Sequence, residues 1–342
     1  MASMSKNPFR RLRKFAKTKA FFALLWLKDL RAGRQLTMVQ DRLKQVGPND
    51  VLLFACLRNE KFRLPYFVDY YRKLGVAHFL FVDNDSTDGF RDWAAAQPDL
   101  SVWHTTASYK RSAFGMLWLN DLLRRHGAGH WCVVVDPDEF LVYPYMRTRS
   151  LHALTAFLDE EQRPCMHAVM LDAYSDTPLP EAVLSEGDSP FEVCPFFDKD
   201  GYVQTLGWGG GVWVRGGPRL RELFNDRPET APAINKIPLI KWQPRFHYRM
   251  SMHDAFPVLL NRPHAKGEVS VTAALFHFKF ISHLKSKADE EMTRGEHYAG
   301  SREYARYQEA PNTCYYDPFV SERYVGPEQL IRLGLMSPGK WF

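Results

Sequence analysis

Cysteine is scarce in this 342-residue sequence, which contains five. Their number is odd, no two of them are spaced as CxxC, and they stand at positions 56, 132, 165, 194 and 314. Cys56 and Cys132 lie inside apolar runs, so buried and reduced thiols are the simplest interpretation. We therefore infer a reducing compartment and expect a cytoplasmic location.

A long hydrophobic run is missing from the N-terminal segment, residues 1–34. Its longest apolar stretch, AFFALLWL at positions 20–27, has eight residues, whereas about 20 are needed to span a bilayer. The segment is therefore not expected to cross a membrane. It is also a poor secretory signal, because its basic stretch is long, its apolar run is short and no small-residue cleavage site follows.

Acidic residues are nearly absent from the same segment. Residues 1–34 contain Asp29 as their one acid against ten Lys or Arg, which gives them a net charge of +9. Because the whole chain carries +6, the remainder carries −3 and is mildly acidic. This distribution argues against a nucleic-acid groove across the body of the protein.

Apolar residues in the basic segment recur with a helical period. They are Phe9, Leu12, Ala16, Ala23, Leu27 and Leu30, with cations between them. Two interpretations stay open: the helix lies on an anionic membrane surface, or it packs on the body and exposes a solvated basic face. In either case residues 1–45 form a basic amphipathic N-terminal segment.

From about residue 50, short apolar runs alternate with helical patterns. The runs have the length of buried strands and stand at 51–57, 77–83, 101–106 and 131–136. Helices are expected at 64–74, from residue 86, and over 109–126. Pro65 and Gly75 bound the first helix, and Ser86 or Thr87 is expected to cap the second. The alternation predicts an α/β fold with a mostly parallel central sheet flanked by helices.

The second half of the chain has a different character. GYVQTLGWGGGVWVRGG at 201–217 is typical of a hairpin, or of a loop that presents Trp208 and Trp213 as a stacking platform for a sugar. No repeat or low-complexity linker separates the halves. We therefore expect one continuous domain, whose second half contains antiparallel strands and loops.

Polar clusters follow three of the expected strands. They are RNE at 58–60, DNDS at 83–86 and DPDE at 136–139. In an open α/β sheet, ligands bind in the crevice outside the carboxyl ends of the strands. The three clusters are therefore expected to converge on one site.

The DPDE cluster places three carboxylates within four positions. Charges of one sign this close repel each other, so a cation or a proton must offset them. Oxygen ligands suit Mg²⁺ or Mn²⁺, and a diphosphate can fill the remaining coordination positions. Two other classes stay open: a non-catalytic nucleotide or carbohydrate binder, and a phosphohydrolase of the haloacid dehalogenase type. Against the phosphohydrolase, the motif lies about 130 residues into the chain and continues as Glu139-Phe140.

With these residues in place, the chain resembles the bacterial glycosyltransferase family 2-like enzymes. The resemblance rests on Arg58-Asn59-Glu60, Leu64-Pro65, Tyr70-Tyr71, Leu74-Gly75, Asp83-Asn84-Asp85-Ser86-Thr87-Asp88-Gly89, Trp131 and Asp136-Pro137-Asp138-Glu139-Phe140. It is dense across residues 56–143 and thin beyond them. It implies a GT-A fold with a nucleotide-sugar-binding half at 46–145 and an acceptor-side half at 146–342.

The resemblance also implies an activity. A hexosyl group would pass from a nucleotide-diphosphate sugar to a glycan or lipid-linked acceptor, with Mn²⁺ or Mg²⁺ bound. Together with the basic N-terminal segment, this suggests surface polysaccharide synthesis by a peripheral protein at the inner face of the cytoplasmic membrane.

The resemblance assigns the donor site by position. Arg58, Asn59 and Glu60 would border the nucleotide. Asp83, Asn84 and Asp85 would hold the base or ribose, although many members of the family have two Asp where Asp83-Asn84 stands here.

The same resemblance assigns the metal corner. Asp136 would contact both the donor and the metal, and Asp138 would bind the metal. Glu139 would orient a ligand from behind or serve in catalysis.

Further candidates each have two interpretations. His277 would be a late metal ligand that closes the site, or a strand histidine among alternating phenylalanines. Asp254, next to His253, would be a general base for an acceptor hydroxyl, or a loop carboxylate. Lys236 and Lys241 would reach a diphosphate, or be solvated.

Overall fold

The structure is a computed structural model that describes residues 8–207, 211–249, 251–264, 268–294, 296, 306–308 and 312–341. The side chains of residues 8–20 and 291–294 lie outside this description.

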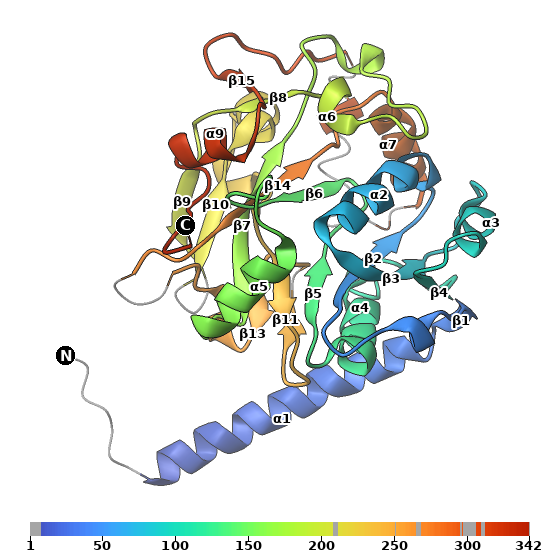
Figure 1. Cartoon of the computed structure of the whole chain (residues 1–342), viewed down its shortest axis with the longest axis vertical. Coiled ribbons are helices and arrows are strands. Elements are labelled where there is room, and N and C mark those ends of the chain that lie inside the picture. The colour runs from blue at the N-terminus through green and yellow to red at the C-terminus, as the bar shows by residue number, and fades with distance from the viewer. Residues whose placement is uncertain are drawn as a thin grey trace.

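A nine-stranded sheet runs through the molecule in the order β1-β4-β3-β2-β5-β11-β7-β14-β6 (Figure 1). Its strands are β1 (Thr37–Gln40), β2 (Val51–Leu57), β3 (Val76–Asp83), β4 (Leu100–His104), β5 (Trp131–Val134), β6 (Glu139–Val142), β7 (Cys165–Asp172), β11 (Asn235–Lys241) and β14 (Ala273–His277). Strands β2, β3, β4, β5, β7 and β14 share one direction, whereas β1, β6 and β11 run against it. The sheet is thus mostly parallel, which confirms the prediction.

Helices cover both faces of this sheet. They are α1 (Pro8–Gly33), α2 (Leu64–Leu74), α3 (Phe90–Ala95), α4 (Met116–Leu122), α5 (Leu151–Glu160), α6 (Pro190–Val193), α7 (His283–Arg294) and α9 (Pro327–Arg332). Leu53 and Ala55 of β2 pack in the core cluster that contains α2, α3 and α5, whereas Leu52 and Phe54 pack in the cluster that contains α4. Burial of both faces explains the unbroken apolar run of β2.

The first helix–strand units follow the sequence closely, and the later ones depart from it. β2 and α2 have the predicted bounds, and Gly75 ends α2 with a left-handed φ of 105°. α3 begins only at Phe90, and neither Ser86 nor Thr87 caps it. The cap prediction was wrong because Ser86 belongs to the turn after β3, where its backbone N–H donates to Asp83.

The helix expected over 109–126 is also shorter than predicted. α4 covers Met116–Leu122 and continues as one π-helical turn, Leu123–Gly127. Gly115 precedes α4 with a φ of 79°, and a Cβ there would lie 3.0 Å from Cys56 Sγ. Ala113 and Phe114 also have positive φ, so the backbone leaves the helical path over these three residues, where a side chain at Gly115 would be both strained and crowded against β2.

The second half completes the sheet and adds three short antiparallel pairs. These are β9 (Val203–Leu206) with β10 (Val212–Arg215), β12 (His247–Tyr248) with β13 (Ala255–Phe256), and β8 (Phe196–Asp198) with β15 (Ser321–Arg323). The first pair confirms the hairpin expected within 201–217. The mostly parallel sheet, its flanking helices and these antiparallel additions form a mixed α/β architecture consistent with the predicted GT-A-like fold.

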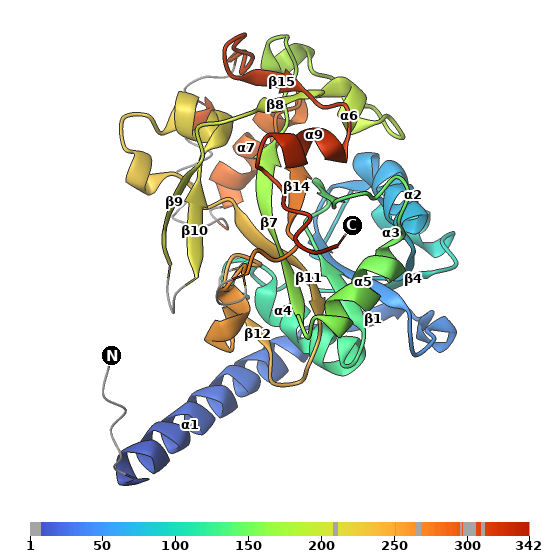
Figure 2. The ribbon, with the colours of Figure 1, turned by 60° about the vertical axis from the view of Figure 1, so that its left-hand side comes forward.

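Helix α1 lies along one edge of the body, and its N-terminal half extends away from it (Figures 1 and 2). The C-terminal part packs on the body through Ala32 and Asp29, which are buried. Phe22 contacts the ring of Phe256 with centroids 4.2 Å apart. Within the part of the chain that the structure describes, no helix is both long and apolar enough to cross a membrane.

Candidate active site

A cavity of about 910 Å³ opens outside the carboxyl ends of β2 and β5. From β2 the parallel strands proceed outward to β3 and β4, and the chain then returns to β5 on the other side of β2. The cavity therefore lies at the topological switch point, where doubly wound sheets bind ligands. The RNE and DPDE clusters line it together, and Asn84 lines it from the third cluster.

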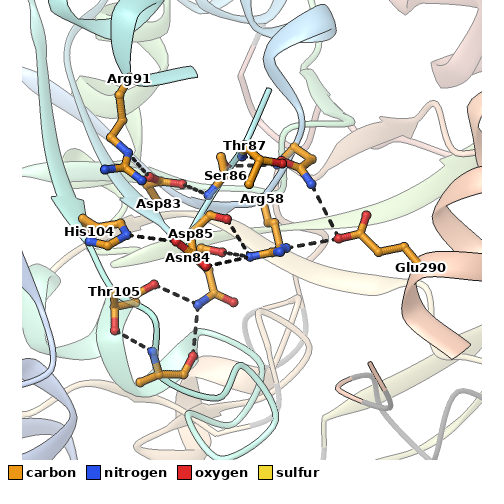
Figure 3. Close-up of polar contacts among 12 residues, drawn as sticks. Arg58, Asp83, Asn84, Asp85, Ser86, Thr87, Arg91, His104, Thr105 and Glu290 are labelled. Carbon is orange, nitrogen blue, oxygen red and sulfur yellow. Dashed lines mark hydrogen bonds and ion pairs between the residues drawn. The ribbon is translucent and has the colours of Figure 1, made fainter. Parts of the chain in front are cut away.

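Arg58 ties the turn after β2 to the turn after β3 (Figure 3). Its guanidinium donates to the backbone carbonyls of Asn84 at 2.8 Å and Asp85 at 2.6 Å. Its Nε lies 3.2 Å from the Glu290 carboxylate, which α7 contributes. The Asn59 side-chain oxygen accepts from the Thr87 backbone N–H at 2.8 Å. The two turns therefore form one polar unit at the edge of the cavity.

Glu60 also connects this polar unit to α7. Its carboxylate is buried and lies 2.7 Å from Arg63 Nε, and it also pairs with Lys287 of α7. Lys287 and Glu290, both on α7, line the cavity. The RNE cluster and α7 are thus joined by ion pairs.

The turn after β3 uses its polar side chains largely to hold its own shape (Figure 3). Asp83 is fully buried, accepts from the Ser86 N–H at 2.8 Å and lies 3.2 Å from Arg91 Nε. The Asn84 amide donates to the carbonyls of Thr105 and Ala107.

The third member of this cluster, Asp85, faces His104 Nε2 at 3.5 Å. Neither Asp83 nor Asp85 lines the cavity. Contact of this cluster with a nucleotide stays a prediction.

Lys236 of β11 lies between two carboxylates of the DPDE cluster. Its Nζ is 2.8 Å from Glu139 Oε1 and 3.3 Å from Asp136 Oδ2. Lys236 and Glu139 are both buried. Part of the positive charge that the cluster requires therefore comes from the protein itself.

Glu139 also shapes the DPDE turn, because its Oε2 accepts from the backbone N–H of Asp136 at 3.1 Å. Burial raises the pKa of Glu139 to about 7, although Lys236 opposes the shift. For Lys236, burial acts to lower the pKa, but Glu139 and Asp136 outweigh it and raise the value. The carboxylate of Glu139 thus points into the protein and holds the turn in place.

His277, at the end of β14, joins two carboxylates. Its Nε2 lies 3.4 Å from Asp138 Oδ2, and its Nδ1 lies 2.6 Å from Asp172 Oδ1. Arg219 Nε in turn donates to Asp172 Oδ2 at 2.7 Å. Burial acts to lower the pKa of His277, but Asp138 and Asp172 outweigh it and raise the value to about 9. This chain of contacts fixes the imidazole with Nε2 toward Asp138.

Asp138 and His277 would present a donor set that fits a divalent cation once His277 gives up its Nε2 proton, because a histidine ligand must be neutral. A carboxylate oxygen and an imidazole nitrogen face each other, and Asp172 orients the ring through the other nitrogen, as carboxylates do behind metal-bound histidines. Among the described residues, no group of three or more His, Cys, Asp or Glu side chains forms a complete metal site. Mg²⁺ sites with one or two carboxylates are completed by water and substrate phosphates, so the pair suits a metal that binds with a diphosphate.

In the second half of the chain, His253 lines the cavity and Asp254 does not. The Asp254 carboxylate accepts from Asn261 at 3.0 Å and lies 4.0 Å from Arg249. His253 Nδ1 is 2.6 Å from the carbonyl oxygen of Asn235. Burial lowers the pKa of His253 to about 3, and Lys236 adds to the shift. His253 is therefore held as a neutral side chain.

Of the remaining candidates, Lys241 lies apart from this arrangement. Lys241 pairs with Asp159 at 2.8 Å, the two side chains are 39% and 42% exposed, and Lys241 does not line the cavity. Trp208 lies outside the described residues. Trp213 lines the cavity, with its ring centroid 6.3 Å from that of His253.

Sequence reasoning overlooked Asp172, Arg219, Lys287 and Glu290. All are separated from the clusters by long stretches of chain, and none stands in a recognisable motif. One local signal was present for Asp172: it ends the apolar run CMHAVMLD, as Asp83 and Asp136 end theirs. The others acquire their roles only through packing.

Comparisons with known proteins complete this description. No protein-family model and no curated protein matches the sequence. Among solved structures, the chain is similar to a mannosyltransferase from Pyrobaculum calidifontis, determined in complex with GDP-Man and Mn²⁺. The identity is 21%, the TM-score is 0.26, and the match covers 47% of this chain and 46% of the mannosyltransferase. The chain thus spans less than half of that protein.

Proposed function

We propose that this protein is a metal-dependent glycosyltransferase that moves a sugar from a nucleotide-diphosphate sugar to a glycan or lipid-linked acceptor. The observation that carries the proposal is that the RNE turn and the Asp138–His277 pair line one cavity at the switch point of the sheet. A nucleotide and a metal-bound diphosphate need these two kinds of surface side by side.

The donor half, residues 46–145, would hold the nucleotide-sugar. Arg58 and Asn59 keep the turns after β2 and β3 together where the nucleoside would lie. Asp138 and His277 would hold Mn²⁺ or Mg²⁺, with Asp136 at the same turn. The metal, when bound, would neutralise charge on the departing diphosphate.

The protein's own residues then keep the site in shape. Lys236 neutralises the buried Glu139, and Glu139 holds the backbone of the DPDE turn. Asp172 and Arg219 fix the orientation of His277. The side chains that would hold the metal are therefore ordered before the donor arrives, which lowers the cost of ordering them on binding.

The acceptor half, residues 146–342, would place the acceptor beside Trp213 and His253. Indole and imidazole rings suit the apolar faces of sugars. We further propose that α1 holds the enzyme at the inner face of the cytoplasmic membrane for surface polysaccharide synthesis. The exposed apolar residues Phe21, Leu24 and Leu27 of this basic helix support that placement.

The test is the binding of nucleoside diphosphates and their sugars, measured by calorimetry with and without Mn²⁺. We expect metal-dependent binding by the intact chain and its loss in Asp138→Asn. If no nucleotide diphosphate binds in a metal-dependent way and Asp138→Asn changes nothing, the proposal is wrong.

Turnover separates an enzyme from a binding protein. Consumption of the bound donor should be followed with cell glycolipid and with a range of glycans present. Binding without turnover across this set would favour a non-catalytic nucleotide or carbohydrate binder.

A further inference from the structure

A second cavity, of about 550 Å³, lies between α1 and the turn that precedes α4. Figures 1 and 2 both show α4 beside the C-terminal half of α1. Five cationic side chains and no Asp or Glu line this cavity; the cations are Lys28, Arg31, Lys110, Arg111 and Arg249. We call it the cationic pocket.

Three of the five cations in this pocket lack a carboxylate partner among the described residues. Among the described residues, no Asp or Glu forms an ion pair with Lys28, Arg31 or Arg111, and all three are exposed. Asp29, on the same helix, is buried and lies 3.1 Å from His247 and 3.5 Å from Arg124. The charge of Asp29 is therefore compensated inside the protein. Arg249 lies 4.0 Å from Asp254, and the Lys110 backbone N–H donates to Glu296 at 2.7 Å. The positive potential of the pocket therefore comes from Lys28, Arg31 and Arg111, and it suits an anion.

The cationic pocket adjoins the active-site cavity. Ala113 and Arg249 line both. A ligand in the pocket could therefore extend past these two residues toward the bound donor.

The pocket also adjoins an apolar surface. Leu24, Lys28 and Arg31 follow each other at spacings of four and three residues, which places them on one face of α1. Phe21, Leu24 and Leu27 are 42%, 54% and 43% exposed. Cations beside exposed large apolar residues are typical of helices that lie on anionic membranes.

We propose that the cationic pocket binds the phosphate or diphosphate of a lipid-linked acceptor, whose lipid tail lies at the membrane surface along α1. The sugar end of the acceptor then extends past Arg249 into the active-site cavity. The inference rests on the proposed function for its lipid-linked acceptor. Guanidinium groups such as those of Arg31 and Arg111 suit phosphate because they can donate two parallel hydrogen bonds to it.

The test compares two kinds of vesicle with the full chain. Both are phosphatidylcholine vesicles, one doped with a polyprenyl diphosphate and the other with phosphatidylglycerol to the same surface charge. We expect the protein to sediment with the first at an affinity at least about tenfold higher, because a bound diphosphate gains charge-assisted hydrogen bonds beyond surface attraction.

Matched variants locate the effect. Lys28→Gln/Arg31→Gln/Arg111→Gln should lose the preference for the diphosphate lipid. Arg34→Gln/Arg42→Gln/Lys44→Gln removes three exposed cations that do not line the pocket and should keep it. Equal loss in both triple variants, or no preference in the intact chain, would overturn the proposal.

A third arm distinguishes a lipid headgroup from a free anion. If inorganic pyrophosphate binds the intact chain and not the pocket variant, while vesicles show no preference, the site takes soluble phosphate and the lipid assignment is wrong. Metal-dependent binding of nucleotide diphosphate is measured on the same proteins and should not change in the pocket variant. Failure of nucleotide binding in the intact chain would overturn the proposed function. The preference for diphosphate-lipid vesicles is a separate measurement and tests only the cationic pocket.

Discussion

The ammonium group of Lys236 lies 2.8 Å from the carboxylate of Glu139, with both side chains buried behind the DPDE turn. A buried ion pair of this kind is costly to break, because the remaining partner is left as an uncompensated charge. Lys236 and Glu139 lie on β11 and β6, which are not neighbours in the sheet. The pair therefore joins separate parts of the sheet beneath the site.

Lys236→Met should destabilise the protein by about 3–5 kcal/mol, because Glu139 would remain buried without its partner. The measurement is the free energy of unfolding in urea. The double variant Lys236→Met/Glu139→Gln should recover part of the loss, since the unpaired charge is then removed.

Lys241 offers the control on the same strand. It pairs with Asp159 at 2.8 Å, but the two side chains are 39% and 42% exposed, so water screens this pair. Lys241→Met should therefore cost no more than about 1 kcal/mol. Similar losses for the Lys236 and Lys241 variants would contradict the role we assign to burial.

Asp172→Asn should weaken metal-dependent nucleotide binding about 10- to 100-fold, because the group that orients His277 is lost. The readout is the Mn²⁺ concentration needed for half-maximal binding of a nucleotide diphosphate. Asp198→Asn is the matched control, because Asp198 is also buried and paired with an arginine, Arg221 at 3.1 Å. A shift of equal size in the control would show a general effect of losing a buried carboxylate.

Arg58→Lys should weaken nucleotide binding by about 1–3 kcal/mol. Nη1 of Arg58 donates to the carbonyls of Asn84 and Asp85 while its Nε contacts Glu290, and a single lysine ammonium group cannot occupy both nitrogen positions. The dissociation constant is measured by calorimetry at saturating Mn²⁺. Lys279→Arg, a charge-preserving change at another residue that lines the same cavity, serves as the comparison. An equal loss of nucleotide affinity in that variant would contradict the role we assign to Arg58.

Leu24→Glu/Leu27→Glu should strongly reduce sedimentation with anionic vesicles, because the exposed apolar face of α1 would become acidic. Removal of residues 1–34 is a less clean test, since it also deletes the buried contacts of Asp29 and Ala32. Leu206→Glu is the control, because Leu206 is 90% exposed on β9, away from α1. Unchanged sedimentation of the double variant would rule out this face of α1.

Thiol labelling should separate Cys314 from the buried cysteines. Cys314 is exposed, whereas burial raises the pKa of Cys165 and of Cys194 to about 12. The thiolate is the reactive form, so at about pH 8 the native protein should label rapidly at Cys314 and slowly at these two positions. All five thiols should react after unfolding. The variant Cys314→Ser should lose the rapid phase, and rapid labelling that survives in it would contradict the prediction.

The parts of this protein that the sequence determined are those governed by short-range periodicity. The apolar run of β2, the helical spacing and the terminal Gly75 of α2, and the polar residues at three strand ends could all be read locally. The mostly parallel sheet followed from their alternation. The convergence of RNE and DPDE on one cavity followed in turn, because parallel strands end at one edge.

Tertiary structure decided what local patterns do not carry. The chain before α4 leaves the helical path at Ala113, Phe114 and Gly115, which all have positive φ, and Gly115 packs closely against Cys56 there. Lys236 reaches Asp136 across 100 residues of chain, and Asp172 reaches His277 across 105. Such contacts depend on the order of strands in the sheet and on burial. A buried charge is costly unless it is paired, so burial makes these ion pairs necessary. The sequence by itself thus determined that the carboxylates of DPDE need positive charge. The fold decided that Lys236 pairs with Asp136 and Glu139, while His277 pairs with Asp138.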